Sequence, residues 1–174
     1  MRGALLALCA AFALAAPALG QKPDDADVLY LPTPPRVVEA MLDLAGLRAG
    51  DVLYDLGSGD GRIPIAAARR GARGTGIELD ARRLAEAREN ARAARVEHLV
   101  TFRQEDALEA DLSGATVVTL FLFPEINRRL RARLERLAPG TRIVSHRFGL
   151  GDWAPHRTVE ADGHPLMLWV VPPR

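Results

Sequence analysis

The chain has 174 residues and a formal net charge of +1 at pH 7. A chain of this length forms one domain around one hydrophobic core. The near-neutral charge argues against a protein that binds nucleic acid through bulk electrostatic attraction. The single cysteine, Cys9, lies in an apolar leader, so the rest of the chain has neither a disulfide nor a thiolate metal site, and no metal is expected.

The amino terminus has the pattern of a secretory signal peptide. Arg2 precedes residues 4–19, which are apolar apart from Pro17, and small residues stand at positions 18 and 20. This pattern predicts a signal peptide over residues 1–20, cleaved before Gln21. The segment is short for a transmembrane helix, which needs about 20 residues. An uncleaved membrane anchor, and so a membrane contact, is the alternative. The leader predicts an exported, periplasmic protein, whereas a misassigned start site would leave it in the cytoplasm.

Residues 21–35 are expected to be extended, because prolines restrict both themselves and the residues before them. Pro32, Pro34 and Pro35 fall in this segment, which is either a linker or a lid over a neighbouring site. A helix is predicted to begin at Arg36 and to end at Gly46. Its apolar face consists of Val37, Val38, Met41, Leu42, Leu44 and Ala45.

The rest of the chain is organised around residues 52–62, V-L-Y-D-L-G-S-G-D-G-R. The order predicts a buried parallel strand, a tight turn and a helix over residues 63–68. Arg62 stands where a dinucleotide fingerprint needs a third small residue, and the lysine of a P-loop is absent. Asp55 at the mouth of the turn would repel a pyrophosphate. It suits a ligand with a cationic end, such as an ammonium group.

A second strand is predicted over residues 74–79, with Glu78 near its end. Glu78 falls 21 positions after Gly57, which places a carboxylate where both hydroxyls of a ribose can donate to it. A solvent-facing acid is the plainer interpretation. Asp80 is expected to cap the next helix, residues 81–94. Leu84, Ala87, Ala91 and Ala94 form the buried stripe of that helix.

The remaining elements complete an α/β fold. A third strand is predicted over residues 100–104, and a fourth over residues 115–124, which is apolar on both faces like a central parallel strand. Its end lies opposite the glycine loop, where open α/β sheets bind ligands. A helix over residues 125–138, with Ile126, Leu130, Leu134 and Leu137 inward, a fifth strand over 141–148 and a hairpin of 157–160 with 166–171 follow. We therefore predict a Rossmann-like, doubly wound, mostly parallel sheet with a C-terminal antiparallel hairpin.

Residues 55–62 resemble the first motif of class I S-adenosylmethionine-dependent methyltransferases. The wider pattern of Pro32-Thr33-Pro34, Gly50-Asp51 and Gly76-Ile77-Glu78-Leu79 is similar to small bacterial methyltransferases. It is also similar to the mitochondrial lysine methyltransferases that act on ATP synthase subunit c. The resemblance implies a methyltransferase domain over residues 36–174, S-adenosyl-L-methionine as cofactor and a protein lysine as acceptor. A small-molecule methyltransferase of the same fold and an exported, non-catalytic binding module are the alternatives.

The resemblance also implies a cofactor site. An acid after the third strand accepts the adenine amino group in this family; Asp106 matches that position and Glu105 competes with it. Residues 21–35 become a lid, with Tyr30 and Thr33 near the methionine end. The cofactor contacts so implied are Tyr30, Asp55, Gly57, Ser58, Gly59, Glu78, Leu79, Asp106, Ala107 and Phe121.

The acceptor side departs from the family pattern. Many amino-group methyltransferases carry Asn/Asp-Pro-Pro-aromatic after the fourth strand, but residues 120–124 are L-F-L-F-P. Backbone carbonyls of residues 119–121 could accept from an amine instead. No residue is selected as catalytic: Asp60, Glu105 and His146 could each assist in removing a proton from a lysine. A structural role is the alternative for His146.

Overall fold

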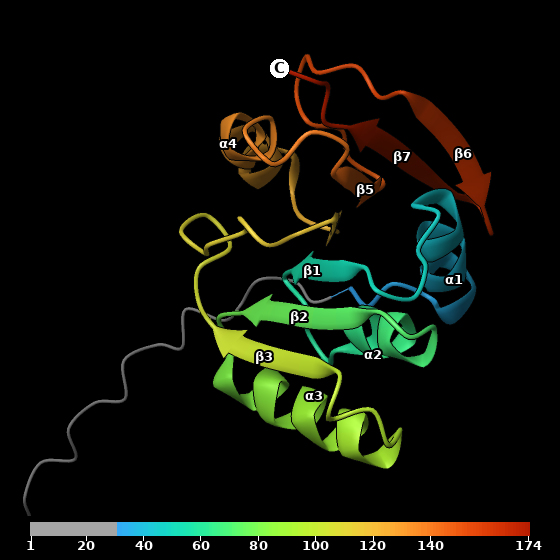
Figure 1. Ribbon diagram of the computed structural model, residues 1–174, viewed down its shortest axis with the longest axis vertical. Coiled ribbons are helices and arrows are strands. Elements are labelled where there is room, and N and C mark those ends of the chain that lie inside the picture. Colours follow the sequence, from blue (N-terminus) through green and yellow to red (C-terminus); the bar gives the residue numbers. More distant parts are fainter. Residues whose placement is uncertain (1–30) are drawn as a thin grey trace, which may run out of the picture.

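The computed structural model describes residues 31–174, which form a seven-stranded sheet in the order β3-β2-β1-β4-β5-β7-β6 (Figure 1). Among the described strands only β7 runs against the others, pairing antiparallel with β5 and β6. This is the predicted doubly wound sheet with its C-terminal hairpin. The strands are β1 (Val52–Leu56), β2 (Arg73–Glu78), β3 (Val100–Gln104), β4 (Val117–Leu120), β5 (Arg142–His146), β6 (Arg157–Ala161) and β7 (His164–Val170).

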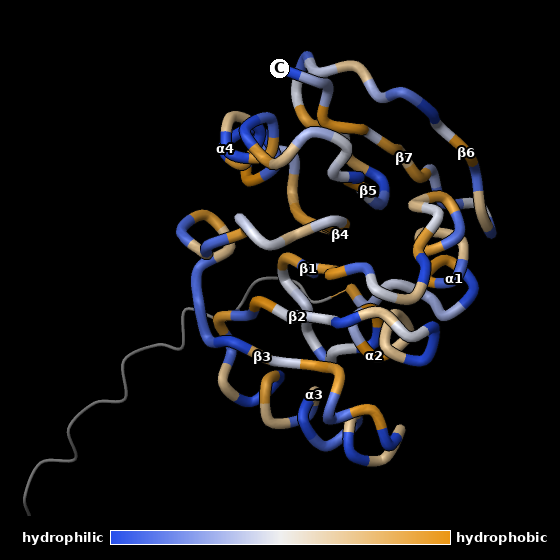
Figure 2. The backbone as a smooth tube through the Cα atoms, in the orientation of Figure 1, coloured by the Kyte–Doolittle hydropathy of each residue, from blue (hydrophilic) through white to orange (hydrophobic). Residues whose placement is uncertain are grey.

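Helices cover both faces of the sheet. The elements α1 (Pro35–Leu44), α2 (Arg62–Arg69) and α3 (Ala81–Ala93) pack on one face, and α4 (Pro124–Leu134) lies on the other (Figure 1). Met41 and Leu42 belong to the core on the α1 side, whereas Leu130, Leu134 and Trp169 belong to the core on the α4 side. Hydrophobic residues gather along the central strands between these layers (Figure 2). Burying both faces explains why β4 is apolar except for Thr119.

Two predicted strands are shorter than expected, and both end beside the glycine loop. The fourth stops at Leu120 because Pro124 begins α4, and Phe123 before it is held in an extended conformation at φ −61° and ψ 151°. The fifth stops at His146 because Arg147 adopts a left-handed conformation at φ 69°. Residues 121–123 and 147–149 are therefore loop segments rather than strand.

The predicted first residue of each helix lies within one position of the observed one. Pro35 rather than Arg36 begins α1, which agrees with the preference of proline for the first turn. The Asp80 carboxylate caps α3 by accepting from the backbone N–H of Arg82 at 2.8 Å. The predicted α4 was too long, since it ends at Leu134, and its fully buried polar residue, Asn127, was not expected.

The predicted leader, residues 1–20, and Tyr30 lie outside the described residues. Within residues 31–174, no helix is long and apolar enough to span a membrane.

Candidate cofactor site

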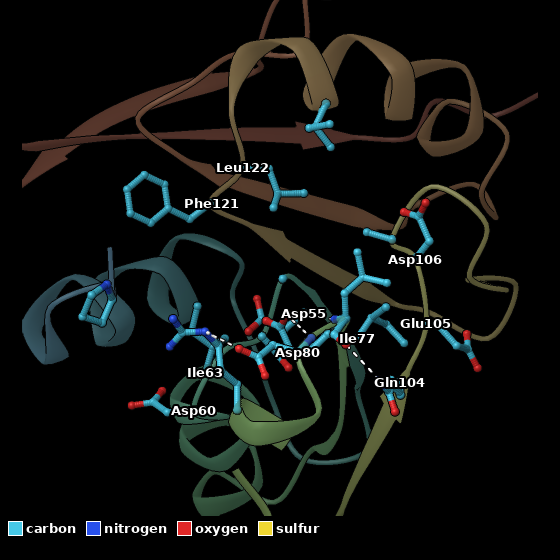
Figure 3. Close-up of a pocket in the computed structure, with 18 of the residues that line it drawn as sticks. Asp55, Asp60, Ile63, Ile77, Asp80, Gln104, Glu105, Asp106, Phe121 and Leu122 are labelled. Atoms are coloured by element: carbon cyan, nitrogen blue, oxygen red, sulfur yellow. Dashed lines mark hydrogen bonds and ion pairs between the residues drawn. The ribbon is translucent and has the colours of Figure 1, made fainter. Parts of the chain in front are cut away.

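A cavity of about 830 Å³ opens at the carboxyl ends of β1, β2, β3 and β4 (Figure 3). Its position is the switch point at which β1 pairs with β2 on one side and β4 on the other. Five segments form its wall: residues 31–33, the glycine loop, the β2–α3 junction, residues 104–108 and residues 121–126.

The glycine loop presents bare backbone to this cavity. Gly57, Gly59 and Gly61 have φ values of 76°, 52° and 79°, which side chains rarely adopt. A Cβ on Gly57 would lie 2.8 Å from Cδ2 of Leu122. The loop also buries the Ser58 hydroxyl, which has no hydrogen-bond partner among the described residues. A ligand approaching this loop therefore finds close access to its backbone.

The Glu78 carboxylate is turned toward the glycine loop. One of its oxygens accepts from the Gly59 N–H at 2.9 Å. The other accepts from the N–H groups of Leu79 and Asp80 at 2.8 and 3.0 Å. These bonds fix the carboxylate between β1 and β2. Its position fits the predicted role as acceptor for two ribose hydroxyls.

Asp55 is a buried carboxylate at the mouth of the loop, only 3% exposed. It accepts a hydrogen bond from the Thr119 hydroxyl at 2.7 Å. The pKa of Asp55 is raised to about 7, chiefly by burial; the negative charges of Glu78 and Asp60 act in the same direction, and the Thr119 hydrogen bond opposes them. Within residues 31–174, no cationic side chain forms an ion pair with Asp55. A cationic ligand group beside it would relieve the cost of its burial.

The two acids after β3 have different partners. The Glu105 carboxylate forms hydrogen bonds with the Arg103 guanidinium at 2.8 and 2.5 Å. Asp106 makes a local turn instead, because one of its oxygens accepts from the Leu108 N–H at 2.8 Å. Both line the cavity, but the ion pair with Arg103 occupies Glu105. Asp106 is therefore the better candidate to accept the adenine amino group, as the resemblance to methyltransferases implied.

Thr33 closes the cavity from the amino-terminal side. Its carbonyl accepts from the Arg62 guanidinium at 2.8 Å, and Arg62 is itself hydrogen-bonded to both Asp60 oxygens. Its hydroxyl lies 3.2 Å from Nδ1 of His146. Thr33 is 5% exposed. These contacts hold residues 31–33 against the glycine loop, as expected for a lid.

The acceptor side of the cavity is apolar. Phe121, Leu122 and Phe123 line it, and the Phe121 ring lies 4.0 Å from that of His146. Phe123 and Leu31 are 47% and 49% exposed. Leu122 is half-buried: it packs against the hydrophobic core and also contributes to the wall. The wall thus offers hydrophobic surface at a position where related enzymes carry a polar side chain.

His146 lies behind Phe121 and does not line the cavity. It is fully buried, and its Nε2 lies 2.9 Å from Nδ1 of His164. The pKa of His146 is lowered to about 4, chiefly by burial, and the nearby His164 and Arg147 act in the same direction. His146 is therefore neutral, with both ring nitrogens engaged. It does not contact an acceptor directly.

Residues 55–157 match the family model of the ANTKMT methyltransferase domain. The chain belongs to this methyltransferase family. It is 38% identical over 151 residues to a protein-lysine N-methyltransferase of Saccharolobus islandicus (strain REY15A), covering 83% of this chain and 94% of that protein. It is also 37% identical to the adenine nucleotide translocase lysine N-methyltransferase of Mus musculus, covering 74% of this chain but only 56% of that protein.

A solved structure supports the fold and the cofactor. An RNA methyltransferase from Salinibacter ruber in complex with S-adenosyl-L-homocysteine is 55% identical, with a TM-score of 0.81. The match covers 83% of this chain and 95% of the Salinibacter chain. The ANTKMT-family enzyme described here is therefore a class I S-adenosylmethionine-dependent methyltransferase.

The cavity of this ANTKMT-family enzyme fits S-adenosylmethionine at both ends. The buried Asp55 suits the ammonium group of the amino-acid moiety, and the orphaned Ser58 hydroxyl lies in the loop beside it. Glu78 suits the ribose. Leu79, which is 63% exposed at the cavity wall, offers an apolar surface for adenine. Within residues 31–174, no group of three or more histidine, cysteine, aspartate or glutamate side chains could hold a metal ion.

Most of the predicted contacts come together in this cavity. Gly59 contacts Glu78 rather than the cavity, and Tyr30 lies outside the described residues; the other eight line the wall. The sequence analysis missed several wall residues at the start of α3 and after β3. The sequence contained a signal for those at the start of α3, because they closely follow Glu78 and so lie at the ligand-binding edge of the sheet. The missed residues include Asp80, Arg82, Arg83, Gln104 and Leu108.

Proposed function

We propose that this enzyme transfers a methyl group from S-adenosylmethionine to the side-chain amine of a protein lysine. The proposal is supported by the names of the Saccharolobus and mouse relatives and by the charge of the cavity. Six carboxylate residues line its wall against three arginines. This excess of negative charge suits a cationic cofactor and a cationic acceptor. The carboxylates are Asp55, Asp60, Glu78, Asp80, Glu105 and Asp106.

The chain's contribution to such a reaction is alignment and exclusion of water. The bound cofactor supplies an activated methyl group on a sulfonium. Asp55, Glu78 and the glycine loop hold that cofactor, while Phe121, Phe123 and Leu31 present hydrophobic surface to the aliphatic part of a lysine. Alignment of this kind supplies roughly 7–11 kcal/mol of the barrier. The incoming ammonium must also lose a proton before its nitrogen can attack.

RNA is a second candidate acceptor, because the Salinibacter structure is described as an RNA methyltransferase. The acidic wall of the cavity opposes it, since a polyanion would approach six carboxylates. The net charge of +1 gives no compensating long-range attraction. A protein lysine is therefore the better acceptor for this cavity.

Methyl transfer into a cell lysate tests the proposal. Purified enzyme and S-adenosylmethionine with a tritiated methyl group are added to lysate, which is then treated with protease or with nuclease. We expect label in the protease-sensitive fraction, and acid hydrolysis of that fraction should release methylated lysine. The variant Glu78→Ala, which is expected to lose the cofactor, serves as the control. Nuclease-sensitive label would indicate RNA, and label in the small-molecule fraction would indicate the alternative enzyme class. Undetectable label despite tight cofactor binding would support a non-catalytic module.

We further propose that residues 1–20 act as a signal peptide and that residues 21–35 join it to the methyltransferase domain. The support is the apolar run and its basic start. Fusing residues 1–21 to alkaline phosphatase, which is active only outside the cytosol, should give enzymatic activity in a bacterial host. Replacing Leu5 and Leu6 with arginine should abolish that activity. Equal activity of both fusions would contradict the proposal.

A further inference from the structure

Three side chains form a hydrogen-bonded chain that leads away from the cavity. Thr33 lines the cavity wall, and its hydroxyl lies 3.2 Å from Nδ1 of His146. The other ring nitrogen of His146 lies 2.9 Å from Nδ1 of His164. His164 is the first residue of β7 and is partly exposed. The chain therefore connects the cavity wall with the surface through a fully buried histidine.

Two of the six acids that line the cavity have roles already described, since Asp80 caps α3 and Asp106 is the candidate for the adenine end. The other four are engaged as well. Arg62 is hydrogen-bonded to Asp60, and Arg103 is hydrogen-bonded to Glu105. Three backbone N–H groups donate to Glu78. Asp55 faces the expected position of the cofactor ammonium. A lysine entering the acceptor side beside Phe121 thus meets no free carboxylate to take its proton among these four groups.

We propose that Thr33, His146 and His164 form a relay that carries the acceptor's proton from the cavity to solvent. The inference rests on the proposed function, since a lysine enters as an ammonium and must lose a proton before its nitrogen can attack the methyl group. Thr33 is the residue that touches the acceptor, and the two histidines act through it. Phe121 packs against His146 and lines the same wall, so the entrance of the relay lies on the acceptor side.

The proton transfers balance along the chain. The ammonium gives one proton to Oγ1 of Thr33, and the Thr33 hydroxyl gives its own proton to Nδ1 of His146. His146 passes the proton on Nε2 to Nδ1 of His164, which releases the proton on its Nε2 to water. The amine keeps its electron pair for the bond to the methyl carbon, and the pair of the broken carbon–sulfur bond stays on sulfur. The chain returns to its first tautomers through water when the cavity opens between turnovers.

The surroundings of His146 favour transfer of a proton through the neutral ring over protonation of the ring. His164 on β7 and Arg147 at the end of β5 are the charged or titratable groups that act on it, and Phe121 of the β4–α4 loop covers its ring. Burial is the main cause of the lowered pKa of His146, and His164 and Arg147 act in the same direction, so His146 stays neutral at working pH. A neutral imidazole can accept on one nitrogen while donating from the other.

The pH dependence of kcat tests the relay, with poly-L-lysine as acceptor. We expect Thr33→Val and His164→Gln to lower kcat at pH 7 by about 100-fold, the lower end of a proton-transfer effect. The deficit should shrink toward pH 10, because free lysine loses its proton unaided near a pKa of about 10.4. Thr33→Ser should retain wild-type kcat. His98→Gln, an exposed histidine outside the chain, is the matched control. The Kd for S-adenosylhomocysteine should stay within about twofold in His164→Gln and His98→Gln, because neither residue lines the cavity.

A measurement without turnover tests the hydrogen-bonded chain itself. Nitrogen-15 NMR of the full-length enzyme should show one proton shared between Nε2 of His146 and Nδ1 of His164, with both rings neutral at pH 7.5. Two unprotonated nitrogens facing each other would overturn the relay, as would variants whose kcat keeps the wild-type pH profile. A wild-type enzyme that methylates neither poly-L-lysine nor any lysate protein would instead overturn the proposed function, and the relay with it.

Discussion

Replacing Glu78 with alanine should weaken binding of S-adenosylhomocysteine by more than about 100-fold, as measured by isothermal titration calorimetry. The carboxylate is held toward the glycine loop by the N–H groups of Gly59, Leu79 and Asp80. Hydrogen bonds to a charged group contribute about 1.5–3 kcal/mol each, and a ribose offers two. Losing both therefore costs at least about 3 kcal/mol, or roughly two factors of ten in Kd. The same variant should lose the rise in Tm that the ligand produces in the wild type.

Glu105→Ala is the matched control. It removes the same charge from the same cavity wall, but the Glu105 carboxylate is already paired with Arg103. Its Kd should stay within about threefold of wild type, since an exposed carboxylate that is already paired contributes little to ligand binding. Equal losses in the two variants would mean that only the charge of the cavity matters. Wild-type affinity in Glu78→Ala would contradict the assignment of the ribose site.

The elements that the sequence predicted well carry strong local signals. The loop after Val52–Leu56 has glycine at every second position, and all three of these glycines have positive φ values. Asp80 stands directly before an amphipathic run and caps it. The position of Glu78 followed from its distance to the loop along one βαβ unit. Such short-range patterns are sufficient to place most of the cofactor site.

Contacts between distant segments could not be read in the same way. Thr33 and His146 are 113 positions apart, and only the sheet order brings them together. The burial of Asn127 was unexpected because its amide donates to the carbonyls of Phe148 and Gly149, which belong to a loop with no local signal. Likewise, the ion pair between Arg103 and Glu105 depends on which side of β3 each side chain occupies. Packing and loop geometry decide these features.

Asp55→Asn should make the ligand-free enzyme more stable at pH 8, raising its Tm by at least about 5 °C. The folded protein holds Asp55 at a pKa of about 7, above the 3.8 of an exposed aspartate. Between these values the unfolded chain loses the proton first, so ionisation of Asp55 reduces stability as pH rises. The loss is complete above pH 7 and reaches up to about 4 kcal/mol. Asparagine carries no charge, and its carbonyl can still accept from the Thr119 hydroxyl.

The pH profile of the variant separates this effect from general repacking. The gain in Tm should vanish below about pH 4, where Asp55 is neutral in both states. Asp43→Asn, at a largely exposed aspartate paired with Arg70, should change stability by no more than about 0.5 kcal/mol at any pH. A Tm gain for Asp55→Asn that is the same at pH 4 and pH 8 would show that the buried charge is not its cause.

Asp55→Asn should weaken ligand binding, although it stabilises the ligand-free enzyme. At pH 8 we expect Asp55→Asn to weaken S-adenosylhomocysteine binding by about tenfold or more, since a charged hydrogen bond to the ammonium is lost. Wild-type affinity should fall as pH drops below 7, because binding the cation requires Asp55 to give up its proton, whereas the affinity of the variant should not. If Asp55 had only a structural role, the neutral asparagine would fill it with greater stability of the folded protein. Greater stability with weaker binding would therefore show that Asp55 is buried for the cofactor.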